Sequence, residues 1–169
     1  MTFTIFFATS TGKTEDVADR LKELLPGAEA KDVDNIDSIN ELVSAESLIC
    51  CIPTWNTGAD EARSGTAWDD LIQEIPDQDF AGKSVAIVGL GDSSGYSDFF
   101  CDAMEELYTA FIQSGAKLIG KVSTEGYNYD DSKSVIDGKF CGLAIDEDNE
   151  SELTDERLQT WVQQINAES

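Results

Sequence analysis

The chain has 169 residues and a formal net charge of −23, from 34 Asp and Glu against 11 Lys and Arg. This charge disfavours nucleic acid and anionic membrane surfaces as partners, because the chain would repel their phosphates. No histidine is present, which removes the commonest general base and metal ligand. The apolar runs are shorter than the ~20 residues of a membrane span, and no basic n-region suggests a signal peptide.

Strand-like and helix-like segments alternate along the chain. Apolar runs predict strands at 2–8, 28–33, 47–52, 84–90 and 117–122. The spacing of apolar residues predicts four helical core faces: Val17, Leu21, Leu24 and Leu25; Trp68, Leu71, Ile72 and Ile75; Phe100, Met104, Leu107, Tyr108 and Phe111; Leu158, Trp161, Val162 and Ile165. Thr154 is the predicted N-cap of the last helix, with Asp155 and Glu156 in its first turn.

This alternation predicts an α/β fold in one domain, residues 1–169. We expect a doubly wound three-layer sandwich around a five-stranded parallel sheet of order 2-1-3-4-5. The polar, turn-rich stretch 123–141 is predicted to be a long loop that splits the last strand, which resumes at about Gly142.

The cysteines are Cys50, Cys51, Cys101 and Cys141, and none forms a C-x-x-C pair. Iron–sulfur or zinc ligation is therefore not expected. We interpret all four as small buried hydrophobes in a reducing compartment, with Cys50 and Cys51 on opposite faces of a strand.

Three loops follow the predicted strands at the edge where open α/β sheets bind ligands. The first, 9–14, contains four hydroxyl side chains, Gly12 and Lys13 just before a predicted helix. Free N–H groups and the helix dipole favour an anion there, and Gly12 lets the backbone approach it. Alone, this loop is equally compatible with an ordinary capped turn. Neither a Walker A loop, whose first glycine would fall at Phe7, nor G-x-G-x-x-G is present.

The loops after the third and fourth strands each carry one aromatic residue, Trp55 and Tyr96, among small polar neighbours. Two rings beside a phosphate site suggest that a flat ring is held between them. A flat ring with a single phosphate points to a mononucleotide such as FMN.

With these loops the chain resembles a flavodoxin along its whole length. The resemblance rests on 9–14, on Pro53-Thr54-Trp55-Asn56, and on the run from Gly91 to Phe99. The late stretch from Gly126 to Asn149 is similar to the long-chain subgroup. The segment 59–67 is longer than in many members and resembles algal versions, which leaves the docking surface there an open question.

The resemblance implies roles for matched positions. Residues 9–14 would hold the phosphate; Trp55 and Tyr96 would sandwich the isoalloxazine ring; Asp148 would reach the ribityl chain. The full predicted FMN site is Thr9, Ser10, Thr11, Gly12, Lys13, Thr14, Pro53, Thr54, Trp55, Asn56, Thr57, Gly58, Leu90, Gly91, Asp92, Tyr96, Asp98, Phe99 and Asp148.

A flavodoxin would shuttle single electrons at low potential between semiquinone and hydroquinone, often in place of ferredoxin, without substrate turnover. The resemblance implies partners with basic docking surfaces, such as ferredoxin/flavodoxin-NADP reductase or photosystem I. We expect a monomer in the cytoplasm, or in the chloroplast stroma if the chain is a processed eukaryotic form.

Two alternatives use similar scaffolds. A flavin-dependent quinone or NAD(P)H oxidoreductase would need substrate-handling groups, and a chain without histidine offers no obvious ones. A receiver domain would need an acceptor Asp at the end of the third strand. The residues there are Ile52, Pro53, Thr54 and Trp55, so we set this reading aside.

Overall fold

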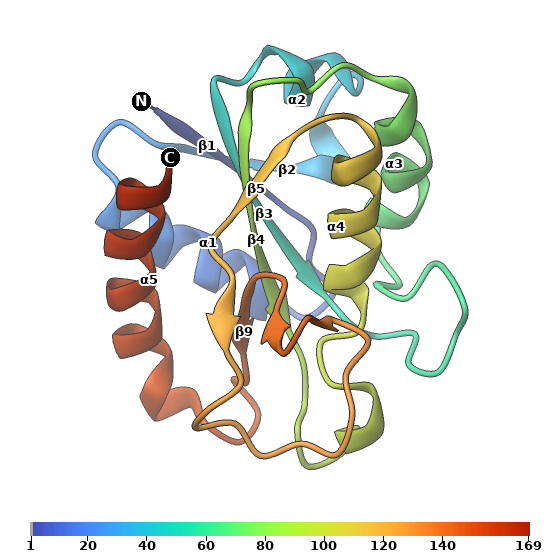
Figure 1. Cartoon of the computed structure of the whole chain (residues 1–169), viewed down its shortest axis with the longest axis vertical. Coiled ribbons are helices and arrows are strands. Elements are labelled where there is room, and N and C mark those ends of the chain that lie inside the picture. The colour runs from blue at the N-terminus through green and yellow to red at the C-terminus, as the bar shows by residue number, and fades with distance from the viewer. Residues whose placement is uncertain (1) are drawn as a thin grey trace.

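The computed structural model describes residues 2–169 and is organised around one parallel sheet of order β2-β1-β3-β4-β5 (Figure 1). A further short strand, β9, also pairs with β4, so that β5 and β9 are the two halves of the interrupted last strand. The predicted fold class and strand order are confirmed. The strands of this sheet are β1 (Phe3–Phe7), β2 (Glu29–Asp32), β3 (Ser47–Pro53), β4 (Ser84–Leu90), β5 (Lys117–Ile119) and β9 (Leu143–Ile145).

Helices cover both faces of the sheet, α1 and α5 on one side and α3 and α4 on the other (Figure 1). Successive residues of β3 point to opposite faces: Cys50 packs in the cluster under α3 and α4, and Cys51 in the cluster under α1 and α5. All four cysteines are free and buried, as predicted. The helices are α1 (Lys13–Leu24), α2 (Asn40–Ser44), α3 (Trp68–Glu74), α4 (Ala103–Gln113) and α5 (Thr154–Glu168). Among residues 2–169, no helix has the length and apolar character to cross a bilayer.

Two buried tryptophans tie helices to the sheet. The Trp68 ring nitrogen donates to the Cys51 carbonyl at 2.8 Å, and that of Trp161 donates to the Gly120 carbonyl at 2.8 Å. Each indole therefore buries its large apolar surface without leaving its N–H unpaired. The predicted core faces around these two residues are confirmed, with Leu71, Leu158 and Ile165 also buried.

The last strand ends earlier than predicted, at Ile119 instead of residue 122. Gly120 has a φ of +83°, and a Cβ there would lie 2.8 Å from the Trp161 ring nitrogen, so the chain turns away from the sheet at this glycine. Val122 belongs to a separate antiparallel sheet of order β6-β8-β7. Its strands are β6 (Val122–Ser123), β7 (Val135–Ile136) and β8 (Lys139–Phe140).

The predicted split of the last strand by a long insertion is confirmed, and the insertion also contains a small sheet that the sequence did not predict. The insertion is mostly polar in sequence, yet it contributes to a cluster of aromatic rings. The ring centroids of Tyr127 and Phe140 lie 5.0 Å apart, and the Tyr129 ring stacks on Phe100 with centroids 5.6 Å apart. Phe100 precedes α4 instead of lying within it, and its buried ring packs against the other three rings of this cluster. Apolar contacts between distant segments, not a local pattern, order the insertion.

Thr154 is not an N-cap, contrary to the prediction. A 3-10 turn, Ser151–Leu153, runs directly into α5, so Thr154 is already helical and Leu153 precedes it without a capping side chain. The Thr154 hydroxyl donates instead to the Glu147 carboxylate at 2.7 Å. Asp155 and Glu156 do lie in the first turn, as expected.

Candidate functional site

The loops after β1, β3, β4 and β9 meet at the carboxyl edge of the sheet, at the lower side of Figure 1. They surround a hollow of about 100 Å³. This volume is below that of typical enclosed ligand pockets, so a mononucleotide would lie partly at the surface. The hollow is lined by Thr11, Lys13, Thr14, Pro53, Thr54, Trp55, Leu90, Gly91, Asp92, Tyr96, Glu147 and Asp148.

The two aromatic side chains of the hollow are unusually exposed. Trp55 is 47% exposed and Tyr96 is 49% exposed, and Ile112 is the only other large hydrophobic side chain of residues 2–169 that is so open. Both rings come from loops at neighbouring strand ends, which the parallel pairing of β3 with β4 brings together. Exposed apolar rings on a concave surface are typical of a site for a flat, apolar ligand group.

The loop before α1 leaves the N-terminus of that helix open. Gly12 is its N-cap residue, with a φ of +92° and no capping side chain. The Gly12 N–H donates to the Thr9 hydroxyl at 2.8 Å, which tightens the loop. The first N–H groups of a helix have no acceptor within it, and here no side chain takes that place. Thr11 and Thr14 line the hollow beside these groups, an arrangement suited to an anion.

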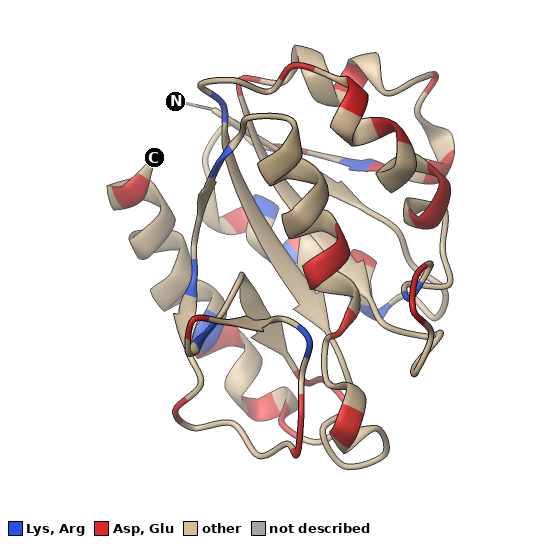
Figure 2. Cartoon of the chain, turned by 45° about the vertical axis from the view of Figure 1, so that its right-hand side comes forward, with Lys and Arg blue, Asp and Glu red and all other residues tan. Residues whose placement is uncertain are grey.

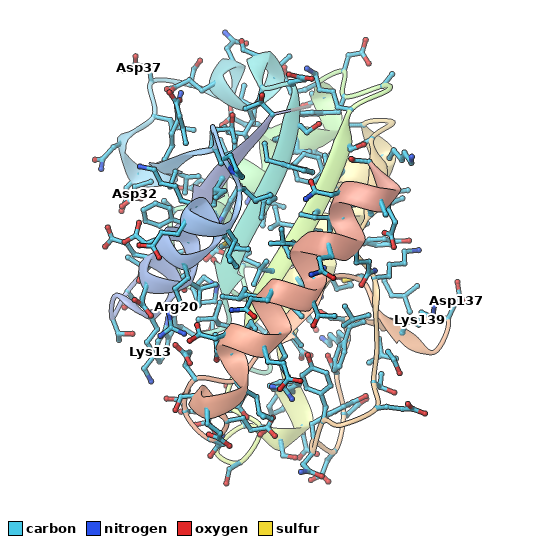
Figure 3. All side chains as sticks on the ribbon, turned by 90° about the vertical axis from the view of Figure 1, so that its left-hand side faces the viewer. Lys13, Arg20, Asp32, Asp37, Asp137 and Lys139 are labelled. Carbon is cyan, nitrogen blue, oxygen red and sulfur yellow. The ribbon has the colours of Figure 1, made fainter. Side chains whose placement is uncertain are left out.

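Lys13 is paired with Asp148 across the hollow, since its ammonium group donates to that carboxylate. This hydrogen bond, helped by the charges of Asp148, Glu147 and Asp92, raises the pKa of Lys13 above its usual value. Arg20 lies further along α1 (Figure 3) and forms an ion pair with Glu147 at 3.4 Å. Lys13 and Arg20 therefore hold the segment after β9 against the first loop and α1.

Asp92 shapes the turn that carries Tyr96. Its carboxylate accepts hydrogen bonds from the N–H groups of Gly95 at 2.8 Å and Ser94 at 3.1 Å, and from the Asn149 amide at 2.8 Å. The Gly95 and Asn149 bonds lower the pKa of Asp92 below its usual range. Because the Tyr96 N–H donates to the Asp92 carbonyl at 3.0 Å, this turn sets where the Tyr96 ring lies.

Eight of the predicted residues lie outside the lining of the hollow: Thr9, Ser10, Gly12, Asn56, Thr57, Gly58, Asp98 and Phe99. Thr9 and Gly12 shape the first loop, as described above. The Asn56 amide donates to the Ala62 carbonyl at 3.1 Å, and a Cβ at Gly58 would lie 3.6 Å from the Phe99 ring. These positions lie in the same loops as lining residues of the hollow, and their contact with a ligand stays a prediction.

The structure also adds residues that the sequence reasoning missed. Glu147 lines the hollow, and Asp146 beneath it is fully buried, where it accepts from Ser93 and from the Asn149 N–H at 3.1 Å. The signal was present in the run 146–149, which follows the resumed last strand. Because that strand is parallel to β4, its carboxyl end had to reach the same edge.

The chain matches the family model described as "Flavodoxin" over residues 5–161. It is 42% identical to the flavodoxin of Nostoc sp. strain PCC 7120 over 97% of this chain and 95% of the relative. It is 40% identical to flavodoxin 1 of Escherichia coli K12 over 97% of this chain and 92% of the relative. The crystal structure of Fusobacterium nucleatum flavodoxin bound to flavin mononucleotide superposes with a TM-score of 0.90 at 34% identity, covering 99% of this chain and 98% of that one. A family match over most of the sequence, together with the same fold, shows that this chain belongs to the flavodoxin family.

Proposed function

We propose that the protein is an electron carrier that binds FMN non-covalently in the hollow at the carboxyl edge of the sheet. The observation that carries the proposal is the pair of exposed rings, Trp55 and Tyr96, beside the uncapped N-terminus of α1. Family membership supports the cofactor, since a relative of the same fold is an FMN complex. It also supports a carrier over an enzyme with its own substrate.

The residues of the hollow fit the two ends of FMN. Hydroxyls of Thr11 and Thr14 and the free N–H groups of α1 suit the phosphate. The faces of Trp55 and Tyr96 suit the isoalloxazine, which supplies one-electron chemistry when bound. Neither Lys13 nor Asp148 is free, because each neutralises the other, so the phosphate loop would bind its anion mainly through uncharged donors.

The remaining predicted residues take roles around the ring edge in this proposal. The Asn56–Thr57 peptide is the proposed partner of flavin N5, with Gly58 next to it in a left-handed conformation at φ +80°. Gly91 and Asp92 line the hollow from the β4 side, and Asp98 and Phe99 lie in the 3-10 turn that follows Tyr96. The side chains of Trp55 and Tyr96 would exclude water from the faces of the bound ring.

The partners are proposed to be redox proteins with basic docking surfaces, such as an NADP reductase or photosystem I, with the protein taking the place of ferredoxin. Figure 2 shows Asp and Glu over the helices and the loops of the carboxyl edge, with few Lys and Arg among them. A surface of this charge attracts a basic partner and speeds its association at low salt. The buried free thiols fit a reducing location, proposed as cytoplasm or chloroplast stroma.

The test is to purify the protein, record its visible spectrum and identify the released cofactor by mass. We expect flavin absorption bands and FMN as the cofactor, because nothing in the hollow resembles an adenine site. FAD at full occupancy would contradict the cofactor assignment. Rapid NAD(P)H-dependent quinone reduction by the isolated protein would favour the oxidoreductase instead.

A further inference from the structure

Arg63 is a buried cation in the long loop between β3 and α3, only 7% exposed. Its guanidinium group donates four hydrogen bonds. Nε donates to the Ala59 carbonyl at 3.2 Å and Nη2 to the Asp60 carbonyl at 3.0 Å. Nη1 donates to the Asp102 carbonyl at 2.9 Å and to the Glu105 carboxylate at 3.1 Å. One side chain therefore fills the inside of the loop and fastens it to the start of α4.

The backbone beside Arg63 is held just as closely. The N–H groups of Ala62 and Arg63 donate to the two carboxylate oxygens of Glu106 at 3.0 and 2.8 Å. Ala62 has a φ of +56°, a left-handed conformation that is unfavourable for a residue with a Cβ. Such strain persists where the surroundings over-determine the backbone, and it is frequent at functional sites. Glu106 and Arg63 together supply that constraint.

The residues that Arg63 and Glu106 hold in place also form hydrogen bonds with Trp55 and Asn56, at the start of the same loop. The Trp55 N–H donates to the Ser64 carbonyl at 3.2 Å, and the Asn56 N–H donates to the Arg63 carbonyl at 2.9 Å. The Asn56 amide group adds its bond to the Ala62 carbonyl at 3.1 Å. Because the Trp55 ring is half exposed, its own packing holds it weakly, and its position depends on these backbone bonds.

We propose that Arg63, together with Glu106, is the positioning residue of the ring-binding loop after β3. The pair holds Trp55 and Asn56 in place before the ligand arrives, so binding costs less ordering of the loop. The inference rests on the proposed function for its consequence, FMN binding. The other part of the inference, that Arg63 orders Trp55 and Asn56, concerns the protein without cofactor and can be tested there.

The test uses Arg63→Lys, which keeps the charge but loses the planar set of donors. In the protein without FMN, amide hydrogen exchange of Trp55 and Asn56 should become about tenfold faster or more, while β4 amides keep their rates. FMN affinity should fall about tenfold, and the visible circular dichroism of the bound flavin should change.

Arg157→Lys is the matched control, because Arg157 is also largely buried and bonds to Glu150 at 3.2 Å and to the Gly126 carbonyl at 3.3 Å. It should leave the Trp55 and Asn56 amides and the FMN affinity as in the wild type. Equal effects of both variants would show a general loss of stability and overturn the proposal.

Unchanged exchange at Trp55 and Asn56 in Arg63→Lys would overturn the proposal, as would faster exchange with FMN affinity and flavin dichroism unaltered. If Arg63→Lys also exposes the β4 amides, Glu106→Gln decides by the same measurements, since it keeps the size of the side chain but removes one acceptor. A wild-type protein that takes up no FMN would refute the proposed function, whereas exchange at Trp55 and Asn56 would still decide the role of Arg63.

Discussion

Among single residues, Thr14 has a hydroxyl group that the fold leaves available for a bound phosphate. The residue is 2% exposed in the first turn of α1, yet its hydroxyl lines the hollow and takes part in none of the hydrogen bonds between residues 2–169. The hydroxyl oxygen is not among the fully buried polar atoms of the described residues, so it can donate a hydrogen bond to a phosphate bound in the hollow.

Thr14→Val keeps the shape of this side chain and removes its hydroxyl. We expect FMN binding to weaken by ~1–2 kcal/mol, because a hydrogen bond to a charged phosphate is lost. Fluorescence titration of the apoprotein with FMN measures the affinity. Thr160→Val, on the exposed side of α5, is the control and should bind as the wild type does. Equal affinities in all three proteins would place the phosphate elsewhere.

The exposure of the Trp55 side chain can be tested by fluorescence quenching. Trp68 and Trp161 are 0% and 1% exposed, so acrylamide should reach only Trp55 in the apoprotein. We expect FMN to remove this accessible fraction of the tryptophan fluorescence, because the flavin covers the ring. Trp55→Phe should lack the accessible fraction even without FMN. If that variant keeps it, the solvent-exposed tryptophan is not Trp55.

At the scale of elements, the insertion between β5 and β9 is fastened to the start of α4 by Asp102. This buried carboxylate accepts from the Lys133 N–H at 2.8 Å through Oδ1, while Oδ2 has no partner. Burial raises the pKa of Asp102 above its usual value, against the opposing effects of the Lys133 N–H and Arg63. A folded-state pKa above the unfolded one means that Asp102 stabilises the fold at low pH, and that this contribution is lost as pH rises through the folded pKa.

Asp102→Asn removes the charge and keeps the Oδ1 acceptor. The free energy of unfolding of the apoprotein should rise by about 1 kcal/mol at neutral pH, the order of cost of a buried polar group lacking a partner. The gain should vanish below the unfolded pKa of about 3.9, where Asp102 is protonated in both states. Urea denaturation at a series of pH values measures this. Asp130→Asn, exposed in the same insertion, is the control. A gain that is larger in acid than at neutral pH would contradict the assignment.

At the scale of the whole molecule, the net charge of −23 acts on any electron added to the flavin. A second electron leaves a negative charge between two rings, where solvation is poor and acidic groups are near. The lower of the two one-electron potentials should therefore lie well below the upper. The three carboxylates that line the hollow, Asp92, Glu147 and Asp148, all have structural partners. The test groups are therefore exposed side chains of the nearby loops, Asp60 and Glu61 in the loop after β3 and Asp98 in the turn after Tyr96.

Neutralising Asp60, Glu61 and Asp98 together to Asn or Gln should raise the lower potential by on the order of 10 mV per charge at low salt, and less at high salt. Reductive titration of the FMN protein measures both potentials. The control triple is Asp37, which lies far from Lys13 (Figure 3), with the exposed Glu29 and Glu46 at the amino ends of β2 and β3. Equal shifts in the two triple variants would mean that overall charge, not the surroundings of the flavin, sets the potential.

Local patterns in the sequence were enough to predict part of the fold and the family. Continuous apolar runs predicted β3 and β4, helical spacing predicted the buried faces around Trp68 and Trp161, and the order of three loops indicated the family and its cofactor site.

Other features depend on residues far apart in the sequence and follow only from the tertiary structure. Gly120 ends β5 because the Trp161 ring fills the space beside it, and Tyr127 and Phe140 order an insertion whose sequence is polar. The tertiary structure also brought Asp148 to Lys13 and Arg63 to Glu106, pairs that no local pattern predicts. The physical reason is that hydrophobic periodicity is written within one segment, whereas close packing and charge pairing are properties of surfaces that meet only on folding.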